Sequence, residues 1–201
     1  MKKNGFTLIE LLIVMTVMGI LGFIFTDILT QSLRGQNKVK ILNQVKQNGQ
    51  VVLDRLVNEV HQAEKVICAG QYSGKDTLVT FKQGVYYRFR IYPPSGTTQN
   101  GYIALDYPLY ATNPCLEDQS ATERFILTDQ DTHSGVSLDY DDTVVEFNSK
   151  IFAVDSEAGY SDAVTIRFRA TAGVEAGSLY EASVEEGGVL FNTTAQVRTY
   201  K

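Results

Sequence analysis

The sequence has few of the residues from which catalytic centres are usually built. Its 201 residues include two histidines and two cysteines. They contain no Gly-x-Ser-x-Gly nucleophile motif, no His-Glu-x-x-His metal motif, no Cys-x-x-Cys pair and no glycine-rich phosphate loop. We therefore predict no enzymatic activity, catalytic residue, cofactor or metal ligand. The alternative of an exported enzyme on a membrane stalk would require that His61 or His133 lies in a cluster with several carboxylates.

Basic residues are outnumbered as well. Eighteen Lys and Arg residues stand against 23 Asp and Glu residues, a net charge of -5. A general nucleic-acid binder is usually basic, so no specific nucleic-acid partner is predicted. Two predicted strands form a local exception, because arginines alternate there with apolar residues. We interpret these arginines as the solvent-facing side of a sheet, with a DNA-binding face as the alternative; they are Arg88, Arg90, Arg167 and Arg169.

No proline occurs before Pro93, so a long N-terminal helix is not interrupted. We predict one helix from Phe6 to about Ile67. Its membrane part, residues 6–33, opens with the apolar stretch Phe6–Thr26, whose 21 residues suffice to cross a bilayer. Residues 34–67 form an amphipathic continuation that packs on a domain, because apolar residues recur there at spacings of three, four and seven. These residues are Leu42, Val45, Val52, Leu53, Leu56, Val60 and Ala63.

From Cys68 onward the hydrophobic pattern changes to period two. Short alternating segments are separated by clusters of Gly, Pro, Asn, Asp and Ser, which predicts a β-rich globular head at residues 68–201. A helix followed by a series of strands predicts an α+β fold, with the second half of the helix packed on an antiparallel sheet. The expected strands are Thr77–Lys82, Val85–Tyr92, Tyr102–Asp106, Arg124–Thr128, Val136–Asp139, Thr143–Val154, Ala163–Thr171 and Val189–Tyr200.

One carboxylate, Glu10, stands inside the apolar stretch. A charged side chain in hydrocarbon costs about 3 kcal/mol on the insertion scale and is usually paired, so Glu10 predicts a partner in the membrane. A secretory signal peptide would need a small-residue cleavage site after the apolar region, and none follows Phe25. A plain single-span anchor fits the length but gives no reason for Glu10.

The segment Gly5-Phe6-Thr7-Leu8-Ile9-Glu10, preceded by a short basic leader, resembles the class III signal of type IV pilins and type II secretion pseudopilins. The resemblance implies that residues 1–5 are a leader, that a prepilin peptidase cleaves after Gly5, and that the new N-terminus at Phe6 is methylated. It also implies that Glu10 pairs with the methylated amine of the next subunit. The expected location is the inner membrane, with the head exported and later carried into a pilus or pseudopilus.

The C-terminal half is similar, more loosely, to minor pilins and pseudopilins of the PilW and GspJ type. The similar segments are Phe125–Thr128, Val144–Phe147 and Phe191–Arg198. Many major pilins have a helix-bending proline where Asp27 stands, and the GspK-type tip subunit typically lacks the glutamate. The resemblance thus implies a structural subunit below the extreme tip that helps to initiate or cap a filament together with other minor and major subunits.

Two features of the head leave alternatives open. An adhesive or substrate-binding tip subunit would present an exposed aromatic patch on residues 93–114, from Tyr102, Tyr107 and Tyr110. A calcium site at Asp129–Gly135, or at Asp139, Asp141 and Asp142, competes with the preferred interpretation, a solvated turn.

The two cysteines, Cys68 and Cys115, are 47 residues apart. In an exported domain such a pair commonly forms a disulfide, which would contribute about 3 to 5 kcal/mol on the entropic model. Spacing alone does not show that the two residues meet, so two free thiols are the alternative.

The leader predicts cleavage between Gly5 and Phe6. Coexpression with a prepilin peptidase should give a mature chain that begins at methylated Phe6, as measured by mass spectrometry. An intact Met1, or a cut beyond Phe25, would exclude the pilin-type signal.

Overall fold

A computed structural model describes residues 7–96, 98–109, 113–116, 123–133, 135–139, 151–157, 160–176 and 188–198. The chain divides into two compact units, Met1–Lys40 and Ile41–Lys201. Most of the predicted strand at Thr143 to Val154 lies outside the described residues. The Val144–Phe147 segment lies wholly outside them.

A single helix, α1, covers Leu8–Gln62, 55 residues without a proline. It ends earlier than the predicted Ile67, because Lys65–Tyr72 forms strand β1. Val66 is β-branched and pairs with Thr80 of the next strand, and the β-branched Ile67 stands at an irregularity between the paired residues Val66 and Cys68. Sheet formation therefore replaces the helical pattern that we extended through them. The turn after β1 uses Ser73 and Gly74, both with positive φ (52° and 75°).

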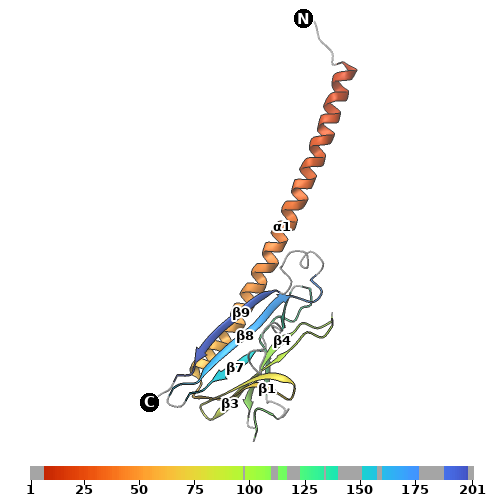
Figure 1. The fold of residues 1–201 in the computed structure, drawn as a ribbon. Coiled ribbons are helices and arrows are strands. Elements are labelled where there is room, and N and C mark those ends of the chain that lie inside the picture. Colours follow the sequence, from red (N-terminus) through yellow and green to blue (C-terminus); the bar gives the residue numbers. More distant parts are fainter. Residues whose placement is uncertain are drawn as a thin grey trace. The chain divides into compact units, whose positions relative to one another are not determined.

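The strands form two antiparallel sheets, as Figure 1 shows in part. Sheet 1 has the order β1-β2-β3-β4-β5, and in sheet 2 the central β8 pairs with β6, β7 and β9. The α+β prediction is confirmed, with one strand, β1, missed by the sequence interpretation. The remaining bounds are β2 Lys75–Lys82, β3 Val85–Tyr92, β4 Tyr102–Leu109, β5 Glu123–Ile126, β6 Val136–Asp139, β7 Phe152–Asp155, β8 Ala163–Ala172 and β9 Val189–Gln196.

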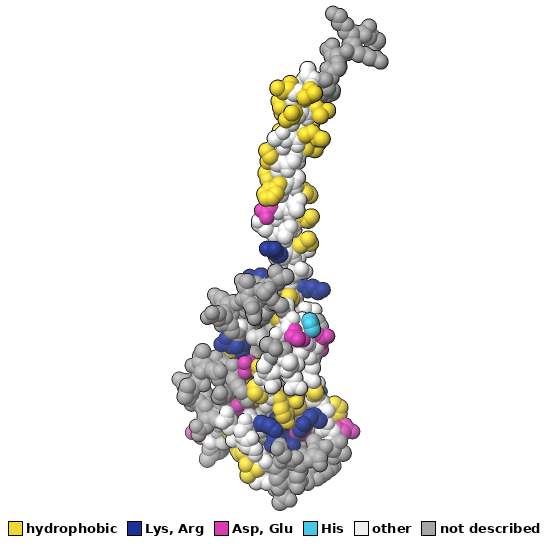
Figure 2. All heavy atoms as spheres, turned by 90° about the vertical axis from the view of Figure 1, so that its right-hand side faces the viewer, with side chains coloured by type: hydrophobic (Ala, Val, Ile, Leu, Met, Phe, Trp, Pro, Cys, Tyr) yellow, Lys and Arg dark blue, Asp and Glu magenta, His cyan; other side chains and the backbone are white. Residues whose placement is uncertain are grey.

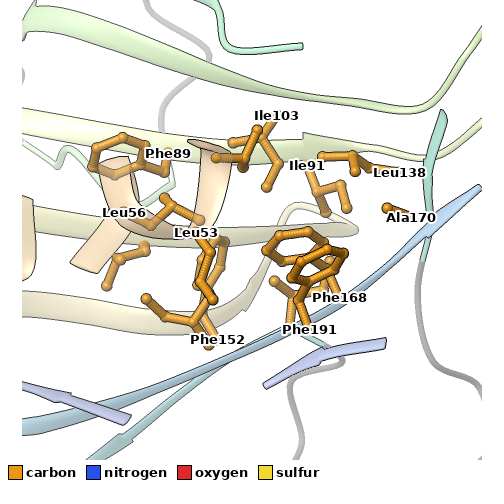
Figure 3. Packing of buried hydrophobic residues seen from close by; sticks show 14 of the residues in the cluster. Leu53, Leu56, Phe89, Ile91, Ile103, Leu138, Phe152, Phe168, Ala170 and Phe191 are labelled. Atoms are coloured by element: carbon orange, nitrogen blue, oxygen red, sulfur yellow. The ribbon is translucent and has the colours of Figure 1, made fainter. Parts of the chain in front are cut away.

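The second part of α1 packs its apolar stripe on both sheets. Figure 3 shows Leu53 and Leu56 between side chains of sheet 1, among them Phe89, and side chains of sheet 2, among them Phe152. The stripe agrees with the predicted amphipathic face; its buried members are Val45, Val52, Leu53, Leu56 and Val60.

Gly49 provides space for a large aromatic ring on this stripe. A Cβ atom at Gly49 would lie 2.3 Å from Cε2 and Cζ of Phe191. Phe191, in β9, in turn stacks on Phe168 of β8, with ring centroids 5.2 Å apart. The glycine is therefore a packing residue, through which β9 approaches the helix closely.

We expect Gly49→Ala to lower the free energy of unfolding by about 1 to 3 kcal/mol, because the new methyl group overpacks the site. Helix propensity alone predicts the opposite sign, a gain of up to about 1 kcal/mol. The measurement is urea unfolding of the soluble fragment that begins at Leu33. Gly35→Ala is the matched control, since no atom beyond the backbone of its own helical turn and its chain neighbours lies within 4 Å of its Cβ position. Equal stabilisation by both substitutions would contradict the packing role.

Candidate assembly site and the covered face of sheet 1

The first turn of α1 is capped by a reciprocal pair. The Glu10 carboxylate accepts hydrogen bonds from the Thr7 backbone N–H (3.1 Å) and from its hydroxyl (3.0 Å). The Glu10 backbone N–H donates in return to Thr7 Oγ1 (3.4 Å). This is the capping box, in which a threonine and a glutamate three residues later satisfy each other's amides. Glu10 thus has a partner within its own chain.

Sequence interpretation missed Thr7, although the Thr-x-x-Glu spacing is the signal for such a cap. The predicted processing residues, Gly5 and Phe6, lie outside the described residues. Cleavage and methylation there stay predictions.

The helix after the cap is long and apolar enough to span a membrane, with a mean hydropathy of 2.6 over an 18-residue window of which none is buried. Figure 2 shows hydrophobic side chains along this part of the helix. Threonine hydroxyl groups in this part donate hydrogen bonds to backbone carbonyls of the same helix, as Thr16 does to Leu12 O (2.8 Å). Local satisfaction of this kind suits a helix in lipid, where water is absent.

The disulfide between Cys68 and Cys115 is present, with the two Cα atoms 6.4 Å apart. Cys68 stands in β1 opposite Val79 of β2, and both cysteines pack on Val79. The bond therefore fastens residues 113–116 to the face of sheet 1 that points away from α1; we call this the outer face.

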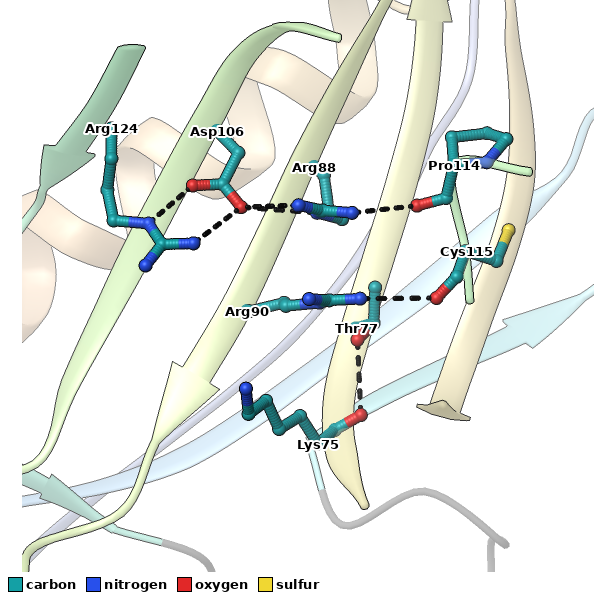
Figure 4. A network of polar contacts seen from close by, with 8 residues as sticks. All are labelled: Lys75, Thr77, Arg88, Arg90, Asp106, Pro114, Cys115 and Arg124. Atoms are coloured by element: carbon teal, nitrogen blue, oxygen red, sulfur yellow. Dashed lines mark hydrogen bonds and ion pairs between the residues drawn. The ribbon is translucent and has the colours of Figure 1, made fainter. Parts of the chain in front are cut away.

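The outer face is not solvated as we predicted, and that interpretation was wrong for Arg88 and Arg90. Both are fully buried. Figure 4 shows the cause: residues 113–116 lie over them, and their guanidinium groups donate to the carbonyls of Pro114 (3.3 Å, from Arg88) and Cys115 (3.4 Å, from Arg90). Alternation of side chains identifies the face of a strand but not what covers it.

The four arginines do not share one face either. Arg88 and Arg90 belong to β3 in sheet 1, whereas Arg167 and Arg169 belong to β8 in sheet 2 and are half-buried. The DNA platform that would combine them is therefore not formed.

Asp106 of β4 is the acidic centre of the outer face and is fully buried. It accepts from Arg88 Nη2 (2.9 Å) and from Arg124 Nε (2.7 Å). Burial alone would raise the pKa of Asp106, but the hydrogen bonds from Arg124 and Arg88, with their positive charge, outweigh it and lower the pKa. The bond to Asp106 in turn raises the pKa of Arg124. Sequence reasoning did not identify Asp106, because its partners come from different strands.

The histidines have structural partners. His61 Nδ1 donates to the backbone carbonyl of Gln196 (2.7 Å), which links the end of α1 to the end of β9. His133 Nδ1 lies 3.5 Å from Glu175 Oε2. In the turn before it, the carboxylates of Asp129 and Asp131 accept backbone N–H groups. Within the described residues no group of three or more His, Cys, Asp or Glu residues could hold a metal ion, and Asp141 and Asp142 lie outside them.

Two of the three tyrosines considered for an adhesive patch, Tyr102 and Tyr107, are partly buried. Tyr107 stacks on Tyr87 (4.9 Å between ring centroids), and Tyr102 stacks on Tyr92 (4.8 Å). Tyr110 lies outside the described residues.

The geometry defines a class: an α+β protein with a capped apolar helix of membrane-spanning length and a disulfide-bonded β domain. Residues 1–26 match the family model described as the prokaryotic N-terminal methylation motif. The chain therefore carries an N-terminal methylation motif, in agreement with the prepilin-type signal expected from its first residues. Comparisons with curated proteins and with solved structures gave no match.

We expect Asp106→Asn to lower the free energy of unfolding at pH 7 by about 3 to 5 kcal/mol, because the substitution removes the negative charge that pairs with both Arg88 and Arg124. Because the folded-state pKa of Asp106 lies below its unfolded value, this stabilisation is present at neutral pH and is lost as the pH falls through the folded pKa. The difference between the variant and the unsubstituted protein should therefore shrink below about pH 4.

The measurement is urea unfolding across pH. Asp54→Asn, a substitution of an exposed carboxylate on α1, is the control and should change little. A pH-independent difference for Asp106→Asn would contradict the ion-pair origin of the effect.

Proposed function

We propose that the protein is a minor pilin or pseudopilin, a structural subunit that helps to initiate or cap a type IV pilus or a type II secretion or competence pseudopilus. The observation that carries this proposal is the combination of the methylation motif at residues 1–26 with Glu10 in the first turn of an exposed apolar helix. In this role the chain is cleaved after Gly5 by a prepilin peptidase, is methylated at Phe6, and waits in the inner membrane with its head exported.

The exposed apolar side chains support assembly through the helix. Leu12, Phe23 and Leu29 are each more than half exposed in the single chain. Such a surface is stable in lipid or against similar helices. On leaving the bilayer, the helix exchanges lipid for the helices of neighbouring subunits, and Glu10 gains the amine of a neighbour's Phe6 as an ionic partner.

Two residues favour a minor position below the tip. Asp27 continues α1 where a major pilin would bend at proline, and it accepts a hydrogen bond from Gln31 (3.0 Å). Glu10 is present, unlike in GspK-type tip subunits. The PilW and GspJ type remains our preferred assignment, on the resemblance of Phe125–Thr128 and Phe191–Arg198.

Glu10 has two roles in this account: it caps the helix, and its charge pairs with the amine of a neighbouring subunit. An assembly experiment must distinguish the two. Glutamine also serves at this position of a capping box, so Glu10→Gln keeps the cap and removes the charge. Glu10→Ala removes both. Thr7→Val removes the hydroxyl that completes the cap and keeps the charge.

We expect Glu10→Gln and Glu10→Ala to insert and be cleaved normally but to reduce filament number by at least about tenfold, because deletion of one member of a buried ion pair typically costs about 3 to 5 kcal/mol. Thr7→Val should assemble nearly as well as the unsubstituted protein. The readouts are filament counts in a strain lacking the native gene and crosslinking to the other minor subunits.

Two other outcomes would contradict a docking role for the Glu10 charge. If Glu10→Gln assembles normally while Glu10→Ala and Thr7→Val fail, the carboxylate acts as a helix cap and not as the docking charge. If all three assemble normally, the helix end has no role in docking and the globular unit must place the subunit.

A further inference from the structure

Strand β5 forms one edge of sheet 1. Among the described strands it pairs only with β4, and all four of its residues, Glu123–Ile126, are exposed. It contains no proline that would block pairing on its outer side. An edge strand of this kind presents unpaired backbone N–H and C=O groups to another chain.

The register identifies the backbone groups that point outward from this edge. The Leu127 N–H, directly after β5, donates to Ile103 O of β4 (3.0 Å). In an antiparallel ladder the hydrogen-bonded residues alternate. Phe125 therefore also directs its backbone groups to β4, whereas those of Arg124 and Ile126 point away from it. These two residues can exchange hydrogen bonds with an added strand.

Side chains are available on both faces of this edge. Phe125 is 45% exposed on the inner face, where it and Val51 of α1 line a groove of about 680 Å³. On the outer face Ile126 is 44% exposed and the Arg124 side chain 46% exposed. Asp106 binds Nε and Nη2 of Arg124, so three of the five guanidinium N–H donors remain for another acceptor.

We propose that β5 binds an extended segment of a partner protein, which adds to sheet 1 as a further antiparallel strand. Directly opposite residues share a face, so the segment that complements residues 127 to 123 is apolar, β-branched, apolar, acidic and basic, in that order. Its acidic residue lies opposite Arg124 and its basic residue opposite Glu123. This binding activity is separate from assembly through the helix and does not depend on it.

An extended partner segment fits this edge better than a second copy of the chain or a helix. Two copies of β5 paired about Arg124 would place like charges opposite one another, and pairing about Phe125 would place Arg124 opposite Ile126. A helix has no free backbone groups along its length to bond those of the edge. A strand of the complementary pattern satisfies both the backbone and the charges.

The test is fluorescence polarisation of the labelled peptide SVTVDKS with the full chain in detergent micelles. In the proposed register its Thr lies opposite Ile126 and its Asp opposite Arg124. The matched peptide SVTVKDS has the same composition, and therefore the same tendency to enter micelles, but opposes like charges at Arg124 and Glu123. We expect SVTVDKS to bind, and SVTVKDS to bind at least about tenfold more weakly.

Backbone methylation of the peptide reads strand addition directly. Methylation of the Thr nitrogen removes an N–H that donates to β5 and should raise Kd at least about tenfold. Methylation of the second Val nitrogen, whose N–H points away from β5, is the matched control and should change Kd little. On the protein, Phe125→Ala should raise Kd about fivefold. Leu190→Ala, at a residue 44% exposed on β9 of the other sheet, should not change it.

The proposal is overturned if SVTVDKS does not bind saturably, if SVTVKDS binds equally well, or if methylation at Thr and at the second Val weakens binding equally. It is also overturned if circular dichroism shows that the bound peptide is helical, which would place a helix in the groove. Sedimentation of the chain alone gives the last outcome: a dimer that Phe125→Ala dissociates would make a second copy the occupant of the edge and would overturn the proposal as well.

Discussion

The contact on which the globular unit depends is the burial of the α1 stripe from Val45 to Val60 against two sheets. Leu56 and Val60 are completely buried, and each fully buried aliphatic side chain contributes about 1.5 to 3 kcal/mol. The stripe joins the inner side chains of both sheets in one core. Gly49 belongs to this contact, because the absence of a side chain there lets Phe191 reach the helix. One face of the helix thereby contacts strands of both sheets, from the early part of the head sequence and from its late part.

The outer face of sheet 1 is held by a different kind of interaction. Two arginines are buried there, and a buried guanidinium requires acceptors for its N–H groups. Asp106 and the carbonyls of residues 113–116 supply acceptors, and the disulfide keeps those carbonyls in place. The cross-link and the polar network thus support one another. The same network leaves Arg124 oriented at the surface beside two stacked tyrosines.

The N-terminal unit has the properties that a helix needs in a lipid bilayer. Its apolar side chains are exposed, and two of its polar side chains are bonded locally, Glu10 to Thr7 and Thr16 to the helix backbone. A carboxylate that is satisfied within its own chain enters a bilayer more easily than an isolated one, and an intersubunit partner later replaces that local contact in the proposed assembly. The cap in the single chain and an ion pair in a filament are compatible, because a carboxylate has two oxygens and can accept from more than one donor.

The sequence by itself determined the properties that depend on local periodicity and spacing. Absence of proline and an apolar run specify the long helix, period-two segments specify most strands, and the motif around Gly5 and Glu10 specifies the prepilin-type signal. The end of the helix was not decided locally, because Lys65–Tyr72 becomes a strand only when β2 is beside it. The covered arginines, the role of Asp106 and the reason for Gly49 also required the tertiary structure. Each depends on contacts between residues far apart in the chain, and burial is a property of what lies above a side chain in space, which alternation along one strand does not encode.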